Sequence, residues 1–336
     1  MRRLVAGAAL VCAAVAGIPQ GASAAGEWRT VPLPFLWPNN AINGLAVQNP
    51  SSVWVAGYQG QYCVRGPSPY SCLLYSPGNP VVRRWDGTRW LEYPLGSAPK
   101  GPIHAVGASG AEVWIADISG YLARFDGTAF TKVATPMGLS ASPLSVNPAG
   151  VWVKQFISST GEGGQFRWTG SGWAETAMPP GVRGISGEVS SVVAGEAWAK
   201  AYVDGAYVLL RWNGTSWADA GPIPSLGPYS TVHDLDAVGP GEAVAVVHPI
   251  ASSADPSRAY RYKDGVWTQI PTPGLDLTGV TVDGLGRLYG LGTEIYRYDG
   301  SAWQEQAFPG GALTPVPGSD AFWAHRTPPT TVSTNS

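Results

Sequence analysis

Charged residues are scarce in this chain of 336 residues, because Asp, Glu, Lys and Arg together make up only 13% of it, about half the share of an ordinary soluble protein. The formal net charge is −2, so the chain lacks the basic field that holds nucleic acid or an anionic membrane surface. Four histidines and three cysteines are present, and no histidine has a partner at the spacing of a zinc site. These absences argue against a nucleic-acid-binding protein and against a zinc hydrolase of the His-Glu-x-x-His type.

Long hydrophobic runs are missing after residue 24, and we therefore expect no membrane-inserted segment there. The first 24 residues have the pattern of a secretory signal: Arg2 and Arg3 precede an apolar run from Leu4 to Gly17, and Ala22-Ser23-Ala24 fits the cleavage site. The run is shorter than the roughly 20 residues that span a bilayer; an uncleaved anchor is the alternative. The sequence predicts a secreted, extracellular protein whose mature chain, residues 25–336, forms one domain.

Two cysteines remain after the signal, Cys63 and Cys72, and a Gly-Pro-Ser-Pro turn lies between them. An even number of cysteines in an exported chain favours a disulfide bond. The alternative, a thiolate metal site, lacks a nearby histidine or further cysteine. We expect a disulfide that links the two arms of an extended loop.

Glycine, proline and tryptophan are abundant, with 44, 30 and 15 copies, which favours many turns over long helices. A phrase of the form Arg-aromatic-Asp-Gly-Thr-x-Trp recurs every 43 residues or so, and its copies begin at Arg84, Arg124, Arg167, Arg211, Arg261 and Arg297. An apolar triplet such as Val53-Trp54-Val55 precedes each copy and also occurs once more, near the carboxyl terminus. The missing copy of the first phrase is supplied by the amino terminus, where residues 26–34 read like residues 265–273.

Each repeat divides into four short strands, and Asp-Gly or Asn-Gly between the last two is a strong hairpin signal in which both residues need a positive φ. Four-stranded units of about 40 to 45 residues are typical of β-propeller blades. The sequence therefore predicts an all-β fold: a single seven-bladed propeller of four-stranded antiparallel blades. We expect Gly26–Pro34 to close the ring by pairing into the blade of Leu313–Arg326, with residues 327–336 as that blade's third strand. A solenoid is the alternative, and it leaves the complementary termini unexplained.

The repeated phrase resembles the Trp-rich propeller repeats of secreted bacterial proteins and, more loosely, kelch and tectonin-type repeats. It does not match the sialidase Asp-box, because the distance from Asp86 to Trp90 is one residue too short and Arg84 replaces the Ser or Thr of that motif. The resemblance covers most of the mature chain. It implies a fold and no particular activity.

Most tryptophans fall at fixed positions of the repeat, so we expect their rings to pack between neighbouring blades. Trp37 lies outside this register and is a candidate for an exposed ligand contact. The repeated arginines are spread around the ring and cannot converge on one anion. We expect them to stack on the hairpin tryptophans or to pair with nearby carbonyl groups or acids.

A polar cluster lies in the predicted inner strand of the fifth unit, where His233, Asp234 and Asp236 align with the inner strand His104-Ala105-Val106 of the second unit. His104 and these three residues are candidate ligand contacts. Asp234 and Asp236 are two residues apart and should share one face of the strand. Two carboxylates at a channel mouth could hold Ca²⁺ or act as acid and base. The alternative is an ordinary polar channel lining, and no other cofactor is expected.

The connections between second and third strands differ most in length, and the longest, Gly57–Val82, carries the predicted disulfide. It would hold Tyr62, Arg65 and Tyr70 in place for a ligand, or else serve only as a staple. The sequence thus favours an extracellular binding or scaffold module, expected to be a monomer, whose partner is a glycan or another extracellular protein. The rival interpretation is a carbohydrate-active hydrolase or lyase that uses Asp234 and Asp236.

Overall fold

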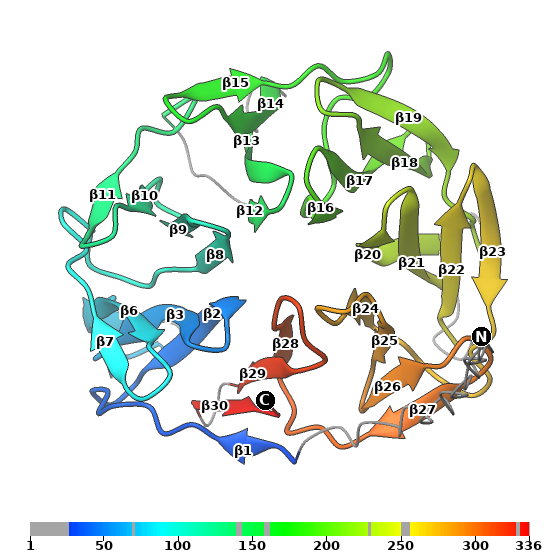
Figure 1. Ribbon diagram of the computed structural model, residues 1–336. Helices are drawn as coiled ribbons and strands as arrows, with labels where there is room; N and C mark the ends of the chain where they lie inside the picture. The colour runs from blue at the N-terminus through cyan, green and yellow to red at the C-terminus, as the bar shows by residue number, and fades with distance from the viewer. Residues whose placement is uncertain are drawn as a thin grey trace, which may run out of the picture.

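The computed structural model describes residues 27–68, 71–138, 143–157, 162–227, 230–249, 256–326 and 330–335. Seven four-stranded antiparallel sheets stand side by side as the blades of a ring around a central channel, which confirms the predicted propeller (Figure 1). The expected signal sequence and Tyr70 lie outside the described residues. Within these ranges, no helix is long and apolar enough to cross a membrane.

In the first six blades the strands follow the chain from the channel outward. Blades I to III are formed by β2 (Ala41–Asn49), β3 (Ser52–Gln59), β6 (Asn79–Trp85) and β7 (Trp90–Glu92); β8 (Ala105–Ser109), β9 (Glu112–Ala116), β10 (Leu122–Phe125) and β11 (Phe130–Lys132); and β12 (Leu144–Asn147), β13 (Gly150–Ile157), β14 (Glu162–Trp168) and β15 (Trp173–Glu175). Blades IV to VI are formed by β16 (Ser190–Val193), β17 (Glu196–Val203), β18 (Ala206–Trp212) and β19 (Trp217–Pro222); β20 (Ser230–Gly239), β21 (Glu242–Pro249), β22 (Arg258–Lys263) and β23 (Val266–Ile270); and β24 (Gly279–Val282), β25 (Leu288–Leu291), β26 (Ile295–Tyr298) and β27 (Trp303–Gln306).

Blade VII joins the two ends of the chain, as the sequence predicted. Its strands β28 (Ala312–Pro315), β29 (Phe322–Arg326) and β30 (Thr331–Thr334) come from the carboxyl terminus, and the outer strand β1 (Arg29–Thr30) comes from the amino terminus (Figure 1). Arg29 pairs with Thr334, and the Val31 amide donates to the Val332 carbonyl at 2.8 Å. The amino-terminal strand thus covers the edge of β30 that blade VII would otherwise leave open.

The turns between third and fourth strands differ from the expected form. In blade I a four-residue loop separates the paired Trp85 and Trp90, and Asp86 Oδ1 accepts the main-chain N–H groups of Thr88 and Arg89, each at 2.8 Å. Gly87 has φ 99°, and Asp86 is not among the described residues with positive φ. The expectation of two positive φ angles is therefore wrong here, because the aspartate caps the loop with its side chain.

The same cap recurs in blades II and VI at Asp126 and Asp299, whereas blade V has the expected turn, with φ 51° at Asp264 and 85° at Gly265. Hydrogen bonds from main-chain amides lower the pKa of Asp86, Asp126 and Asp299 to about 2.

Tryptophans fill the wedges between blades, as predicted. The ring of Trp54 in blade I is buried and lies with its centroid 4.8 Å from Phe125 of blade II, and Trp152 of blade III packs in the same way on Trp212 of blade IV at 5.1 Å. Across the closure, Trp323 of blade VII contacts Trp85 of blade I at 6.4 Å. Each second-strand aromatic thus fastens its own blade to the next one.

The repeated arginines are structural, as expected, but their aromatic partner differs. Arg124, Arg211 and Arg261 form ion pairs with the glutamates that begin the neighbouring second strands, Glu112, Glu196 and Glu242. The guanidinium of Arg211 also lies over Trp198, 5.3 Å from the ring centroid. The stacking is on the second-strand tryptophan and not on the hairpin tryptophan, because pairing in the sheet sets the arginine directly beside the former.

Candidate functional site

The connection between β3 and β6 forms a separate two-stranded sheet outside the blade, β4 (Tyr62–Arg65) and β5 (Cys72–Ser76). A disulfide between Cys63 and Cys72 links the two strands with a Cα separation of 5.4 Å, which confirms the predicted bond. Every residue of β4 is exposed. The hairpin therefore adds nothing to the core of blade I, and its side chains are free to meet another molecule.

Trp37 lies at the base of this hairpin. The Gly60 amide donates to the Pro38 carbonyl at 3.1 Å, and the Trp37 amide donates to the side chain of Gln59 at 3.1 Å. The indole of Trp37 is 58% exposed, as the sequence predicted for an aromatic residue outside the repeat. A β-carbon at Gly60 would make an ordinary contact of 3.4 Å with this indole, so it is the φ of 68° that favours glycine at the hairpin base.

An open cleft of about 670 Å³ lies between the hairpin and the chain segment before β2, and we call it the hairpin cleft. It brings together two predicted site residues, Tyr62 and Arg65, with side chains that sequence reasoning missed. The complete lining is Asn39, Asn40, Tyr58, Gln61, Tyr62, Cys63, Arg65, Ser71, Cys72 and Tyr75. The missed residues come from two segments about twenty positions apart, and no local pattern indicates that they meet.

Strand pairing places Arg65 and the disulfide on one face of the hairpin, whereas Tyr62, one residue before Cys63, lies on the other face and still lines the cleft. Cys63 lies opposite Tyr75, and Arg65 lies opposite Cys72 after a one-residue irregularity in β5. Residues two apart on a strand share a face, so Arg65 is on the face that carries the disulfide. The opposite face carries Val64 and Leu74, which are 49% and 56% exposed.

The second group of predicted site residues lies in the central channel, in a cavity of about 560 Å³. His233, Asp234 and Asp236 line it from β20, and Glu188 and Lys200 of blade IV join them. The pairing of β20 with β21 shifts at His233, and beyond the shift Asp234 and Asp236 lie opposite Val246 and Val244, so both are on one face of the strand. Sequence reasoning missed Glu188 and Lys200 because they approach from another blade.

The two aspartates have partners in different blades. Asp234 accepts the main-chain N–H groups of Leu235 and Val280, both at 2.9 Å, and so links blade V to blade VI. Asp236 accepts a hydrogen bond from the hydroxyl of Ser190 in blade IV. Burial and the nearby charge of Asp234 raise the pKa of Asp236 to about 7, although the Ser190 hydrogen bond acts against this shift.

The histidines are not gathered into one site. His233 stacks on His248 with ring centroids 4.2 Å apart, and burial together with the facing His248 lowers the pKa of His233. His104 is exposed ahead of the inner strand of blade II and lines neither the hairpin cleft nor the channel cavity. Among the described residues, no group of three or more His, Cys, Asp or Glu is arranged to hold a metal ion.

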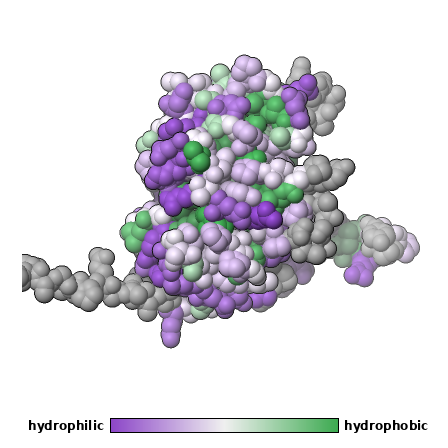
Figure 2. Space-filling model, turned by 90° about the vertical axis from the view of Figure 1, so that its right-hand side faces the viewer, coloured by the Kyte–Doolittle hydropathy of each residue, from purple (hydrophilic) through white to green (hydrophobic). Residues whose placement is uncertain are grey.

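The remaining surface shows mixed character. In Figure 2 the outer wall of the ring carries hydrophobic residues in small groups between hydrophilic ones. At the ends of the inner strands the channel widens to a cavity of about 1000 Å³ lined largely by valine, leucine, glycine and proline. Polar side chains also line this cavity, among them Gln48, Asn147 and Glu188.

No protein-family model and no curated protein sequence matches the chain. Solved propellers do match. The structure of "YCF48 bound to D1 peptide" has a TM-score of 0.58 at 12% identity, over 91% of this chain and 94% of that one. The WD40 propeller domain of Doa1 has a TM-score of 0.56 at 10% identity, over 92% and 97% of the two chains. A chain of the mitotic checkpoint complex has a TM-score of 0.55 at 13% identity, over 97% and 98%. At these identities the likeness concerns the fold alone: the chain is a seven-bladed propeller similar to those of the YCF48 and WD40 types.

Proposed function

We propose that this protein is an exported binding module that holds a glycan in the hairpin cleft of blade I. The observation that carries the proposal is the composition of the cleft: three phenols, three side-chain amides and one guanidinium line it, and the exposed indole of Trp37 lies beside it. Amides and phenols both donate and accept hydrogen bonds, which suits the hydroxyl groups of a sugar. Exposed aromatic faces suit its apolar C–H surface.

Two further features support a binding role. The disulfide and the main-chain hydrogen bonds at the hairpin base hold the cleft in shape before a ligand arrives, which lowers the ordering cost of binding. Among the described residues that line the cleft, none is an acid, so the site lacks the pair of carboxylates with which glycosidases cleave their substrates. The amino-terminal signal pattern supports a location outside the cell, where a disulfide persists.

A second candidate function is glycoside hydrolysis in the channel. Asp236 has a pKa near neutrality and lies beside a second carboxylate, Asp234. Such a pair resembles the acid and base of these enzymes. Both oxygens of Asp234, however, accept main-chain N–H groups, and the bond from Val280 holds blade VI against blade V. This bonding favours a structural role for Asp234, and we therefore rank binding above hydrolysis.

The test is a glycan-array screen of residues 25–336, followed by titration of each hit against two variants. Tyr75→Ala removes a phenol from the cleft and should weaken binding about tenfold or more. Tyr202→Ala is the matched control, since Tyr202 on β17 is 57% exposed and Tyr75 is 56% exposed. The proposal fails if no glycan binds, if both variants bind like the parent, or if the bound glycan is cleaved. A polypeptide partner, such as the peptide that YCF48 binds, would also overturn it.

A further inference from the structure

The charge among the described lining residues of the hairpin cleft is positive. Arg65 is the sole charged side chain among its described lining residues, and the other polar groups are amides, phenols and one hydroxyl. The channel cavity has the opposite balance, with Glu188, Asp234 and Asp236 against Lys200. An anionic ligand would therefore be attracted to the hairpin cleft and repelled from the channel.

Arg65 also differs from the repeated arginines because its side chain does not stabilise a blade. The repeated residues Arg124, Arg211 and Arg261 each pair with a glutamate of their own blade. Within the described part of the chain, Arg65 has no hydrogen bond or ion pair from its side chain, and it is exposed. Its main chain is nevertheless held, because it pairs with the disulfide-bonded Cys72. A guanidinium on a fixed strand and without a partner is available for a planar, two-oxygen anion.

Two of the side-chain amides that line the cleft with Arg65 already donate hydrogen bonds within the protein. Asn40 Nδ2 donates to the Trp37 carbonyl at 2.9 Å, and Gln61 Nε2 donates to the Tyr75 hydroxyl at 3.2 Å. The hydroxyl of Tyr75 accepts that bond and keeps its own hydrogen for a ligand. The cleft thus offers both a cation and a phenol donor, and no carboxylate among its described lining residues competes for them.

We propose that the hairpin cleft selects glycans that contain a carboxylated sugar, with Arg65 binding the carboxylate through two parallel N–H···O hydrogen bonds. This inference rests on the proposed glycan-binding function and names its ligand class. Neutral hydroxyl groups of the same glycan would contact the amides and phenols. Aromatic stacking would add affinity without distinguishing acidic from neutral sugars.

The test compares a uronic-acid oligosaccharide with the same oligosaccharide after reduction of its carboxyl groups, by calorimetry on residues 25–336. The acidic form should bind about tenfold or more tightly, and the difference should shrink as salt is added. Arg65→Gln should abolish this preference, so that the acidic and the reduced forms bind with equal affinity. Arg65→Lys should keep only part of it, because an ammonium group cannot make the two parallel bonds. Arg89→Gln, in the blade I turn and with a side chain that is 77% exposed, is the control and should change nothing.

Each outcome separates this inference from the proposed function. If both oligosaccharides bind equally and Tyr75→Ala weakens both, the cleft is a glycan site and the carboxylate selectivity is wrong. Stronger binding of a sulfated oligosaccharide, or of a peptide through its terminal carboxylate, would overturn the choice of a carboxylated sugar. If neither oligosaccharide binds, and the array gives no hit, the proposed function itself fails.

Discussion

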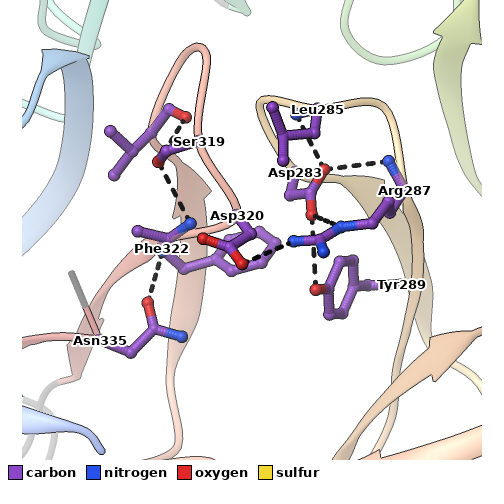
Figure 3. Close-up of polar contacts among 10 residues, drawn as sticks. Asp283, Leu285, Arg287, Tyr289, Ser319, Asp320, Phe322 and Asn335 are labelled. Atoms are coloured by element: carbon purple, nitrogen blue, oxygen red, sulfur yellow. Dashed lines mark hydrogen bonds and ion pairs between the residues drawn. The ribbon is translucent and has the colours of Figure 1, made fainter. Parts of the chain in front are cut away.

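Arg287 and Asp320 join blade VI to blade VII across the last interface of the ring: Nη2 of Arg287 lies 3.1 Å from the carboxylate of Asp320 (Figure 3). Arg287 Nε lies 2.6 Å from Asp283, whose side chain is fully buried. Asp283 also accepts the main-chain N–H groups of Leu285 and Arg287, both at 2.9 Å. The arginine thus neutralises a buried acid and reaches the neighbouring blade with the same group.

This relationship predicts an unequal response to substitution. Arg287→Met should lower the free energy of unfolding by roughly 1 to 3 kcal/mol, because it leaves the Asp283 carboxylate buried without its cation. Asp320→Ala should cost less than about 1 kcal/mol, because that carboxylate is 39% exposed. Denaturant titration followed by tryptophan fluorescence would measure both. Equal costs, or a greater cost for Asp320→Ala, would contradict the assignment of Asp283 as the group that needs Arg287.

The amino-terminal strand predicts a second effect on stability. Trp28 Nε1 donates to the Ala307 carbonyl of blade VI at 2.7 Å, and the ring packs against Phe308. Trp28→Ala should lower the free energy of unfolding by roughly 2 to 3 kcal/mol, because the half-buried indole packs between blades VI and VII. Trp37→Ala, which removes an exposed indole, should change it by less than about 0.5 kcal/mol. Similar costs for the two substitutions in thermal unfolding would show that β1 does not fasten the ring.

The repeat made most of the ring predictable. The apolar triplet marks the second strand of all seven blades, and the Arg-aromatic motif marks the third strand of the first six. The two termini could be joined from the sequence because residues 26–34 repeat residues 265–273. The turns were less predictable. The sequence indicated a two-residue turn with two positive φ angles, whereas in blade I the side chain of Asp86 accepts main-chain hydrogen bonds and stabilises a four-residue loop.

The candidate site was predictable only where a residue departs from the repeat. Trp37, Tyr62 and Arg65 stood out because they lie outside the register or in the long connection. Asn39 and Gln61 could not be found in the same way, since their meeting depends on a main-chain hydrogen bond between distant segments, 3.2 Å from the Gln61 amide to the Asn39 carbonyl. Pairing between strands of one blade is local, whereas the cleft arises from loops that the repeat does not specify.

The channel acid Asp236 predicts a pH dependence of stability. Its pKa of about 7 in the folded protein exceeds the value of about 3.9 in an unfolded chain, so folding takes up a proton between these pH values. Stability therefore falls as pH rises from about 4 to 7, and the ionised carboxylate remains unfavourable above pH 7.

Asp236→Asn removes this charge and keeps an oxygen that can accept the Ser190 hydrogen bond. The variant should be more stable than the parent by roughly 1 to 2 kcal/mol at pH 8, after allowance for water in the channel, and equal to it at pH 4. The variant should keep a weaker loss of stability with rising pH, because burial also raises the pKa of Glu188. Denaturation midpoints across this range test the prediction, and a parent that gains stability from pH 4 to 7 relative to the variant would refute it.

The capped turns predict unusually acidic aspartates on the surface. Main-chain N–H donors hold the pKa of Asp126 and Asp299 at about 2, so both should stay ionised in an NMR titration down to about pH 3. The stabilisation that comes from these carboxylates is present above the unfolded pKa and is lost as pH falls through 2. Blade IV provides an internal comparison, because Asn213 makes the same bonds to Thr215 and Ser216 without a titrating group. Chemical-shift midpoints near 4 for both aspartates would contradict the cap.

The hairpin that carries the cleft should open independently of the ring. Its strands form a separate sheet, β4 is exposed along its whole length, and the Cys63–Cys72 disulfide joins them. Replacing both cysteines by serine should lower hydrogen-exchange protection in β4 and β5 about tenfold or more and shift global unfolding by less than about 0.5 kcal/mol. Ligand affinity should fall together with protection, because the open hairpin must be ordered again on binding. Reduction of the parent chain should reproduce both effects. A loss of about 3 kcal/mol in global stability, the full loop-closure value, would instead show that the hairpin unfolds together with blade I.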